Sequence, residues 1–99
     1  MDKSAMITGR EARELAEAWL AALSVRLGID LAIDDKATRE ETWCWVFFYN
    51  SAVYLETGSF SHALAGNGPV LVEKNCGTIH QLTSAKPVET QLADLRNQQ

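Results

Sequence analysis

Two cysteines and two histidines are the residues of this 99-residue chain whose types suit nucleophilic catalysis. A cysteine nucleophile needs a base and an orienting group within hydrogen-bond reach, and Cys44 with His62 or His80 is the cysteine-centred candidate. Cys44 falls on the apolar face of a predicted strand, where burial disfavours the thiolate and makes the thiol inert. We therefore predict a structural role for Cys44, and two free thiols in a reducing compartment rather than a disulfide with Cys76.

The groups that could bind a metal or support hydrolysis through paired carboxylates form incomplete sets. Cys76 and His80 are four residues apart, but that spacing does not converge on a metal in a hairpin, and no second ligand pair completes a tetrahedral site. Glu56 and Glu73 flank the central connection, and nothing in the sequence brings them together. We predict no catalytic residue, no metal and no cofactor; a small hydrolase using Cys44 or Cys76 is the enzyme-class alternative.

A glycine-rich segment at 65–69, Ala-Gly-Asn-Gly-Pro, could in principle let a phosphate approach the backbone. It lacks the Lys-Ser/Thr of a P-loop and leads into a strand rather than into a helix N-terminus. We therefore predict a tight turn with a positive φ at one of three residues, Gly66, Asn67 or Gly68.

The composition is that of a single soluble globular domain spanning residues 1–99, with a net charge of −4 and nine scattered basic residues. This balance argues against a nucleic-acid partner, whose binding depends on clustered Lys and Arg. The longest apolar run, residues 43–49, is far too short for a membrane span, and no export signal is visible, so we expect a cytoplasmic protein.

Acidic residues are densest in segment 30–41, where they outnumber the basic residues Lys36 and Arg39. They are Asp30, Asp34, Asp35, Glu40 and Glu41. This segment is interpreted either as a solvated loop or as a patch that steers a cationic protein.

A long helix is the clearest element in the sequence. Thr8 and Glu11 form a capping box, which predicts a helix beginning at Gly9, and Gly28 can take the left-handed conformation that ends it. Apolar residues at three- and four-residue steps predict one buried stripe. Its members are Ala12, Leu15, Ala16, Trp19, Ala22, Leu23 and Leu27.

Two hairpins and a closing helix are predicted after it. Alternation predicts a short strand at 29–33, followed by a loop at 34–41, and β-favouring residues predict a hairpin of 42–49 with 52–56 around Asn50-Ser51. A connection at 57–69 contains one helical turn near Ala63–Ala65. A second hairpin pairs 70–73 with 78–82, and Pro87 opens a short helix with a stripe of Val88, Leu92 and Leu95.

These elements predict an α+β fold, with a long N-terminal helix packed on an antiparallel sheet of four to five strands and a short C-terminal helix. Seven of the eight aromatic residues lie between Trp43 and Phe60. Period-2 alternation divides the first hairpin into two faces. We expect Cys44, Val46, Phe48, Val53 and Leu55 to pack on the long helix, and the opposite, aromatic face to remain partly available: Trp43, Trp45, Phe47, Tyr49, Tyr54 and Glu56.

The chain resembles the YrhB family, also called immunity protein 35, in several strings that occur in the family's order. These are Trp45-Val-Phe-Phe-Tyr-Asn-Ser51, Tyr54-Leu-Glu-Thr-Gly58, Ala63-Leu-Ala-Gly-Asn-Gly-Pro69 and Gly77-Thr-Ile-His80. The resemblance extends to Met6-Ile-Thr8 and Ala85-Lys-Pro87 and so covers nearly the whole chain. It implies a small bacterial α+β protein that neutralises a toxin by binding it, and it assigns no catalytic residues.

The leading hypothesis is therefore a cytoplasmic immunity protein that binds and neutralises a cognate toxin protein without catalysis. We expect the contacts to come from the acidic loop and the aromatic face: Asp34, Asp35, Glu40, Glu41, Trp43, Trp45, Tyr49, Tyr54 and Glu56. One branch implied by the resemblance is chaperone-like, so the alternative is a holdase that binds unfolded proteins through an exposed aromatic face. A homodimer through a sheet edge or aromatic patch is also open, and no nucleic-acid or membrane partner is expected.

Overall fold

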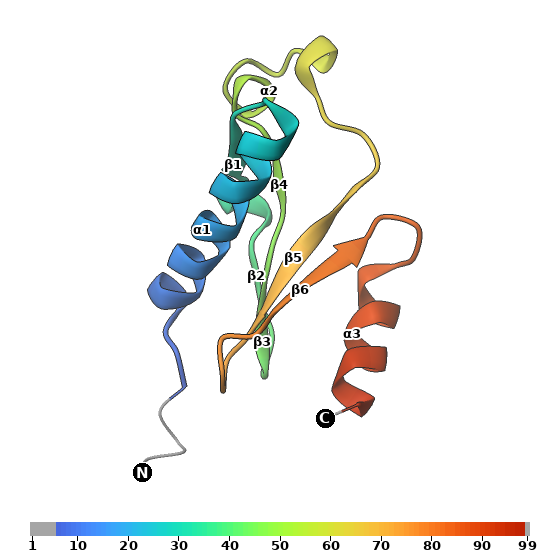
Figure 1. Ribbon diagram of the computed structural model, residues 1–99. Helices are drawn as coiled ribbons and strands as arrows, with labels where there is room; N and C mark the ends of the chain where they lie inside the picture. The colour runs from blue at the N-terminus through green and yellow to red at the C-terminus, as the bar shows by residue number, and fades with distance from the viewer. Residues whose placement is uncertain (1–5, 99) are drawn as a thin grey trace.

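The computed structural model describes residues 6–98, which form an α+β fold in three layers (Figure 1). A four-stranded antiparallel sheet in the order β2-β3-β5-β6 lies in the middle, and a separate two-stranded ribbon pairs β1 with β4. Helix α1 covers one face of the sheet and α3 the other. The helices are α1 (Gly9–Leu27), α2 (Ala52–Thr57) and α3 (Val88–Asn97), with 3-10 turns η1 (Asp35–Ala37) and η2 (Phe60–His62). The strands are β1 (Leu31–Ile33), β2 (Arg39–Glu40), β3 (Cys44–Phe47), β4 (Tyr49–Ser51), β5 (Asn67–Glu73) and β6 (Ile79–Thr83). This arrangement confirms the predicted fold class.

Helix α1 begins and ends where its local signals predict. The Thr8 hydroxyl accepts a hydrogen bond from the Glu11 N–H at 3.1 Å, and Glu11 Oε1 accepts one from the Thr8 N–H at 2.8 Å. Gly28 ends the helix at φ 70°.

The buried stripe of α1 differs in part from the predicted one. Ala12, Ala16 and Leu20 are buried, with Trp19 and Leu23 partly buried beside them. The predicted stripe omitted Leu20. It included Leu15 and Leu27, which are 38% and 49% exposed. The physical reason is that Leu15 lies at the margin of the buried face, next to the turn at Gly77, and Leu27 lies in the last helical turn.

The predicted hairpin around Asn50-Ser51 is wrong. β3 pairs with β2 and β5, β4 pairs with β1, and residues 52–57 form helix α2 instead of a strand. The Ser51 hydroxyl accepts a hydrogen bond from the Tyr54 N–H at 3.0 Å, which makes Ser51 an N-cap, and Gly58 ends α2 at φ 75°. Ser51 therefore caps a helix instead of forming the predicted hairpin turn.

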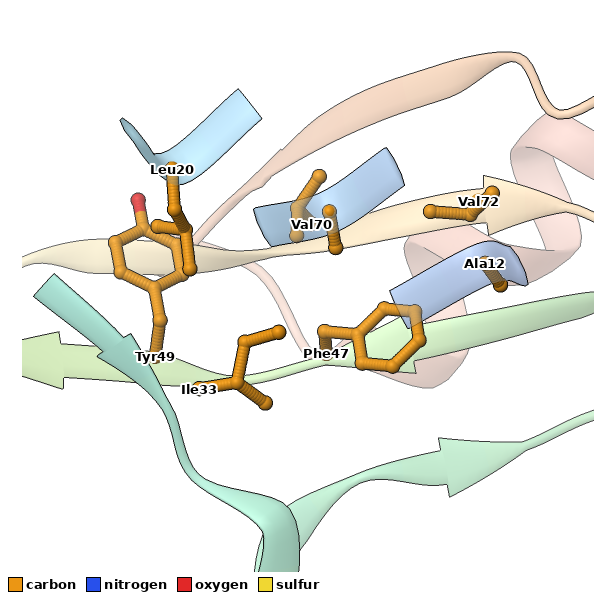
Figure 2. Close-up of a cluster of buried hydrophobic side chains, with 8 residues drawn as sticks. Ala12, Leu20, Ile33, Phe47, Tyr49, Val70 and Val72 are labelled. Carbon is orange, nitrogen blue, oxygen red and sulfur yellow. The ribbon is translucent and has the colours of Figure 1, made fainter. Parts of the chain in front are cut away.

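The alternation along 44–49 is confirmed, but the assignment of its two faces is reversed. Phe47 and Tyr49 pack with α1 (Figure 2). The partly buried Trp45 packs against the same cluster. Cys44 and Val46 are buried on the opposite face in a cluster with α3, and Phe48 packs against that cluster. Both sheet faces are covered by a helix, so both sides of the strand are apolar, and the pattern does not indicate which side meets the longer helix.

The segment 34–41 is more ordered than the predicted loop. It contains η1 and the two-residue edge strand β2, which pairs with β3 in the register Arg39↔Val46 and Glu40↔Trp45. The apolar island at 63–65 is likewise not the helical turn of the next connection, because that turn is η2 at 60–62.

The second hairpin is confirmed, with an earlier start. β5 begins at Asn67 rather than at Val70, and its register with β6 is irregular between these two residues. Of the three residues predicted to include a positive φ, Gly66 has one, at 80°. A Cβ on Gly68 would lie 2.1 Å from the carbonyl oxygen of Leu82. The glycines therefore shape a turn and a close approach between strands.

Helix α3 is confirmed at the predicted position, with Pro87 as its N-cap residue. Val88, Leu92 and Leu95 pack on the cluster around Cys44 and Leu71. The side chain of Gln91, which is 8% exposed, fixes the helix to the end of β6: its Oε1 accepts from the Thr83 N–H and its Nε2 donates to the Thr83 carbonyl, both at 2.8 Å.

Candidate interaction surface

The carboxylates predicted as contacts in segment 34–41 have different surroundings. Three of the four are held in ion pairs within the chain: Arg13–Asp35 at 3.1 Å, Lys74–Glu40 at 2.8 Å and Arg39–Glu41 at 2.8 Å. These hydrogen bonds raise the pKa of Arg13, through Asp35, and of Arg39, through Glu41. Asp34 is the fourth, and its half-exposed carboxylate has no side-chain partner among residues 6–98.

The aromatic residues predicted as contacts are largely used in packing. Tyr49 is 5% exposed and meets Trp19 edge-on at 5.9 Å between ring centroids. Burial raises the pKa of the Tyr49 phenol, and a hydrogen bond with Gln81 opposes that shift. The ring of Trp45 lies under the start of α1, with Lys74 Nζ 4.8 Å from its centroid. The expectation that this aromatic face stays available is therefore wrong for Tyr49, because α1 covers it.

Glu41 and Trp43 lie at a different place, beside α3. They line a surface hollow of about 330 Å³ together with Arg39, Glu89 and Arg96. Arg39 is paired there with both Glu41 and Glu89, and the pKa of Glu89 is lowered by its own backbone N–H and by Arg39. The nine predicted residues consequently do not form one continuous surface.

Three of the predicted residues line one hollow beside α2. Asp34, Asp35 and Tyr54 line a surface hollow of about 430 Å³, with Leu55 and Gly58, and Glu56 is exposed on the same short helix. A neighbouring hollow of about 310 Å³ shares Asp34, Tyr54 and Leu55. This is where the acidic and the aromatic parts of the prediction meet.

Phe60 is a conspicuous residue of this region that the sequence-based set omitted. It is 83% exposed, and its ring centroid lies 5.9 Å from that of Tyr54. Val53 of α2 is 43% exposed. A single phenylalanine inside a connection rich in Ser and Gly was the signal in the sequence that could have identified Phe60, since such a residue has few local apolar neighbours.

Two asparagines fix the segment that carries Phe60. Asn50 Oδ1 accepts from the Leu64 and Ser51 N–H groups, both at 2.7 Å, and Asn67 Nδ2 donates to the Tyr49 carbonyl at 2.9 Å. Leu64 also packs against the main core. Residues 59–66 are thus held to the β1–β4 ribbon at their far end.

The thiols and histidines are placed as structural or surface groups. Burial raises the pKa of the Cys44 thiol to about 12, so it is neutral at physiological pH. Cys76 is exposed in the β5–β6 turn, and His80 is hydrogen-bonded to Glu73. Both cysteines are free, as predicted. Among the described residues there is no group of three or more His, Cys, Asp or Glu side chains that could hold a metal ion.

Comparisons with known proteins add a family to this geometry. The sequence model of the family described as immunity protein 35 matches residues 10–95. The curated protein "Uncharacterized protein YrhB" of Escherichia coli (strain K12) is 44% identical over 50 residues, which are 50% of this chain and 53% of that protein, so the match spans about half of each. No solved structure matches significantly. Within residues 6–98, no helix has the length and apolar character needed to cross a membrane.

Proposed function

This chain belongs to the immunity protein 35 family, and we propose that it binds a cognate bacterial toxin domain in the cytoplasm and thereby neutralises it. The observation that carries this proposal is the family match, which extends over residues 10–95 and so includes every helix and strand except the first residue of α1 and the last two of α3.

Neutralisation by binding requires no chemistry from the immunity protein. The arrangement of reactive groups supports this mode, because the Cys44 thiol is buried and neutral and lies among Val46, Leu71 and Leu92. The exposed thiol of Cys76 has the Glu73 carboxylate and the Thr78 hydroxyl as its hydrogen-bonding side-chain neighbours in the β5–β6 turn.

We retain Asp34, Asp35 and Tyr54 as contact residues because they line one hollow beside α2, and Glu56 because it is exposed on the same short helix. The holdase alternative depended on an open aromatic face, and much of that face packs under α1. No observation on residues 6–98 favours it.

Co-expression with a toxin domain cloned from the genes adjacent to this one tests the proposal. Cells that produce the toxin together with this chain should grow, whereas cells that produce it with an immunity protein of another family should not. The purified chain should also form a stable complex with a catalytically inactivated toxin in size-exclusion chromatography. Absence of both the rescue of growth and the complex would refute the proposal.

A further inference from the structure

An exposed phenylalanine stands out on the surface beside α2. Phe60 is 83% exposed although phenylalanine is among the residues most often buried, and its ring lies beside that of the partly buried Tyr54 in α2. Val53 of the same helix is 43% exposed. Isolated apolar residues on a surface need no explanation, but an apolar group with a polar rim indicates an interaction site. We call these three residues, with Asp34 and Glu56, the α2 surface.

The α2 surface is presented on backbone that is already fixed. The Gly58 N–H donates to the Tyr54 carbonyl at 2.7 Å, and the Thr57 hydroxyl accepts from the Ser59 N–H at 3.2 Å, which joins α2 directly to η2. Asn50 holds the far end of the segment. An aromatic anchor on preorganised backbone loses little conformational entropy when it binds, which is the usual property of residues that dominate an interface.

The charge around this surface has one predominant sign. The carboxylates of Asp34 and Glu56 have no side-chain partner among residues 6–98, and neither has that of Asp30, whose backbone carbonyl accepts from the first residue of α2. Against these three carboxylates, Lys36 contributes one positive charge to the rim of the hollow. Asp35 is paired with Arg13, whose guanidinium also pairs with Glu17.

From these observations we propose that the α2 surface docks onto a cationic face of the toxin, with Phe60 entering an apolar recess surrounded by Lys and Arg side chains. This proposal rests on the proposed immunity function and specifies which surface carries it. Unpaired carboxylates at the rim accelerate association with a cationic partner and disfavour other partners.

The same charges argue against the other occupants of this surface. In a symmetric dimer each copy contributes the same patch, so the carboxylates of Asp34 and Glu56 would face an equally acidic surface. An anionic lipid surface would be repelled in the same way. A partner of opposite charge satisfies both the apolar and the ionic parts of the surface.

The apolar part is tested with Phe60→Asp and a matched control, Val25→Asp. Val25 is 84% exposed and lies on α1, so the two substitutions place the same charge at equally exposed apolar positions. The probe is the toxin domain whose toxicity this chain suppresses in the co-expression test, inactivated in its own active site, and the measurement is its dissociation constant by titration calorimetry. Phe60→Asp should weaken binding by about 100-fold or more, as expected for an interface anchor, and Val25→Asp by less than about twofold.

The ionic part is tested with the double variant Asp34→Lys and Glu56→Lys. Its control is Glu14→Lys, an exposed α1 residue whose carboxylate has no ion pair among residues 6–98. The double variant should slow association by about 10-fold at low salt, and the difference should shrink as the ionic strength rises. The control should associate at close to the wild-type rate.

The outcomes separate this proposal from the function on which it rests. If the wild-type chain does not bind the toxin domain, both are refuted. If the wild type binds, and Phe60→Asp and the double variant bind within about twofold of it, only the docking surface is refuted. A wild-type dimer that Phe60→Asp converts to a monomer would also overturn it, in favour of a second copy as the occupant. Unchanged circular dichroism and melting temperature establish that each variant is folded, and Phe60→Ser provides a second variant without added charge.

Discussion

The role of Asn50 in holding the segment before β5 can be tested by truncating its side chain. Asn50 Oδ1 accepts hydrogen bonds from the Ser51 and Leu64 N–H groups at 2.7 Å each, and its Nδ2 donates to the Leu64 carbonyl at 3.4 Å. Asn50→Ala removes all three. Asn50→Asp keeps the acceptor for the two short bonds but places a carboxylate oxygen against the Leu64 carbonyl.

The expected magnitude follows from these bonds. A typical intramolecular hydrogen bond contributes about 0.5 to 1.5 kcal/mol net, and an unsatisfied half-buried donor costs more. Counting the two short bonds, Asn50→Ala should lower the free energy of unfolding by about 2 kcal/mol, and Asn50→Asp by about half as much. At about 4 to 8 °C per kcal/mol for a domain of this size, the melting temperature of the Ala variant should fall by about 8 to 16 °C.

Urea denaturation gives the change in free energy, and hydrogen exchange gives its location. In Asn50→Ala, the Leu64 amide should exchange faster than in wild type by more than the global loss of stability explains, because its acceptor is gone. Asn75→Ala is the control, since Asn75 is exposed in the β5–β6 turn, and its stability should change by less than about 0.5 kcal/mol. If Asn50→Ala is as stable as this control and the Leu64 amide keeps its protection, the reasoning fails.

Three further predictions concern the rest of the fold. Gln91→Leu should lower the free energy of unfolding by about 2 kcal/mol in urea titration and expose the Thr83 amide to hydrogen exchange. The reason is that Leu matches Gln in helix propensity but cannot form hydrogen bonds with the Thr83 backbone. Wild-type protection of that amide in the variant would contradict this prediction. Gly68→Ala should cost about 2 to 4 kcal/mol in thermal and urea unfolding, since its Cβ would lie 2.1 Å from a backbone oxygen of β6; an equally stable Ala variant would show that the strands can separate there. In the native protein a thiol reagent should modify Cys76 alone and reach Cys44 only after unfolding, and rapid reaction of both thiols at neutral pH would exclude a buried Cys44. Burial raises the pKa of the Cys44 thiol to about 12. The free energy of unfolding gained from the neutral thiol should therefore be fully present below the ordinary thiol pKa and should decline as the pH rises toward 12.

Elements with strong local signals were predicted from the sequence nearly to the residue. The capping box at Thr8 and the left-handed Gly28 depend on residues within a few positions of each helix end, so the bounds of α1 follow from the chain alone. The β5–β6 hairpin and the start of α3 after Pro87 were predicted at the right place, although β5 begins three residues earlier than predicted.

The segment from 50 to 57 was mispredicted because two local signals compete there. Asn50-Ser51 favours a turn and Val53-Tyr54-Leu55 favours a strand, but Ser51 also serves as an N-cap. β4 pairs with β1, 16 to 20 residues earlier in the chain, and the helix begins directly after β4. The exposed residues of this region therefore differ from the predicted contact set: Tyr49 is in the core, and Phe60 is exposed.

Local signals in the sequence were enough to predict the α+β class, both ends of α1, the start of α3 and a free, buried Cys44, and shared strings led to the proposed immunity function. Those properties depend on residues close together in the chain, or on strings that a family shares. Only the folded chain shows which face of β3 meets α1, which carboxylates are paired, that Asp34 and Tyr54 line one hollow, and that Phe60 lies beside Tyr54. Each of these depends on contacts between distant segments, and a strand that is apolar on both sides carries no local information about which partner will cover which side.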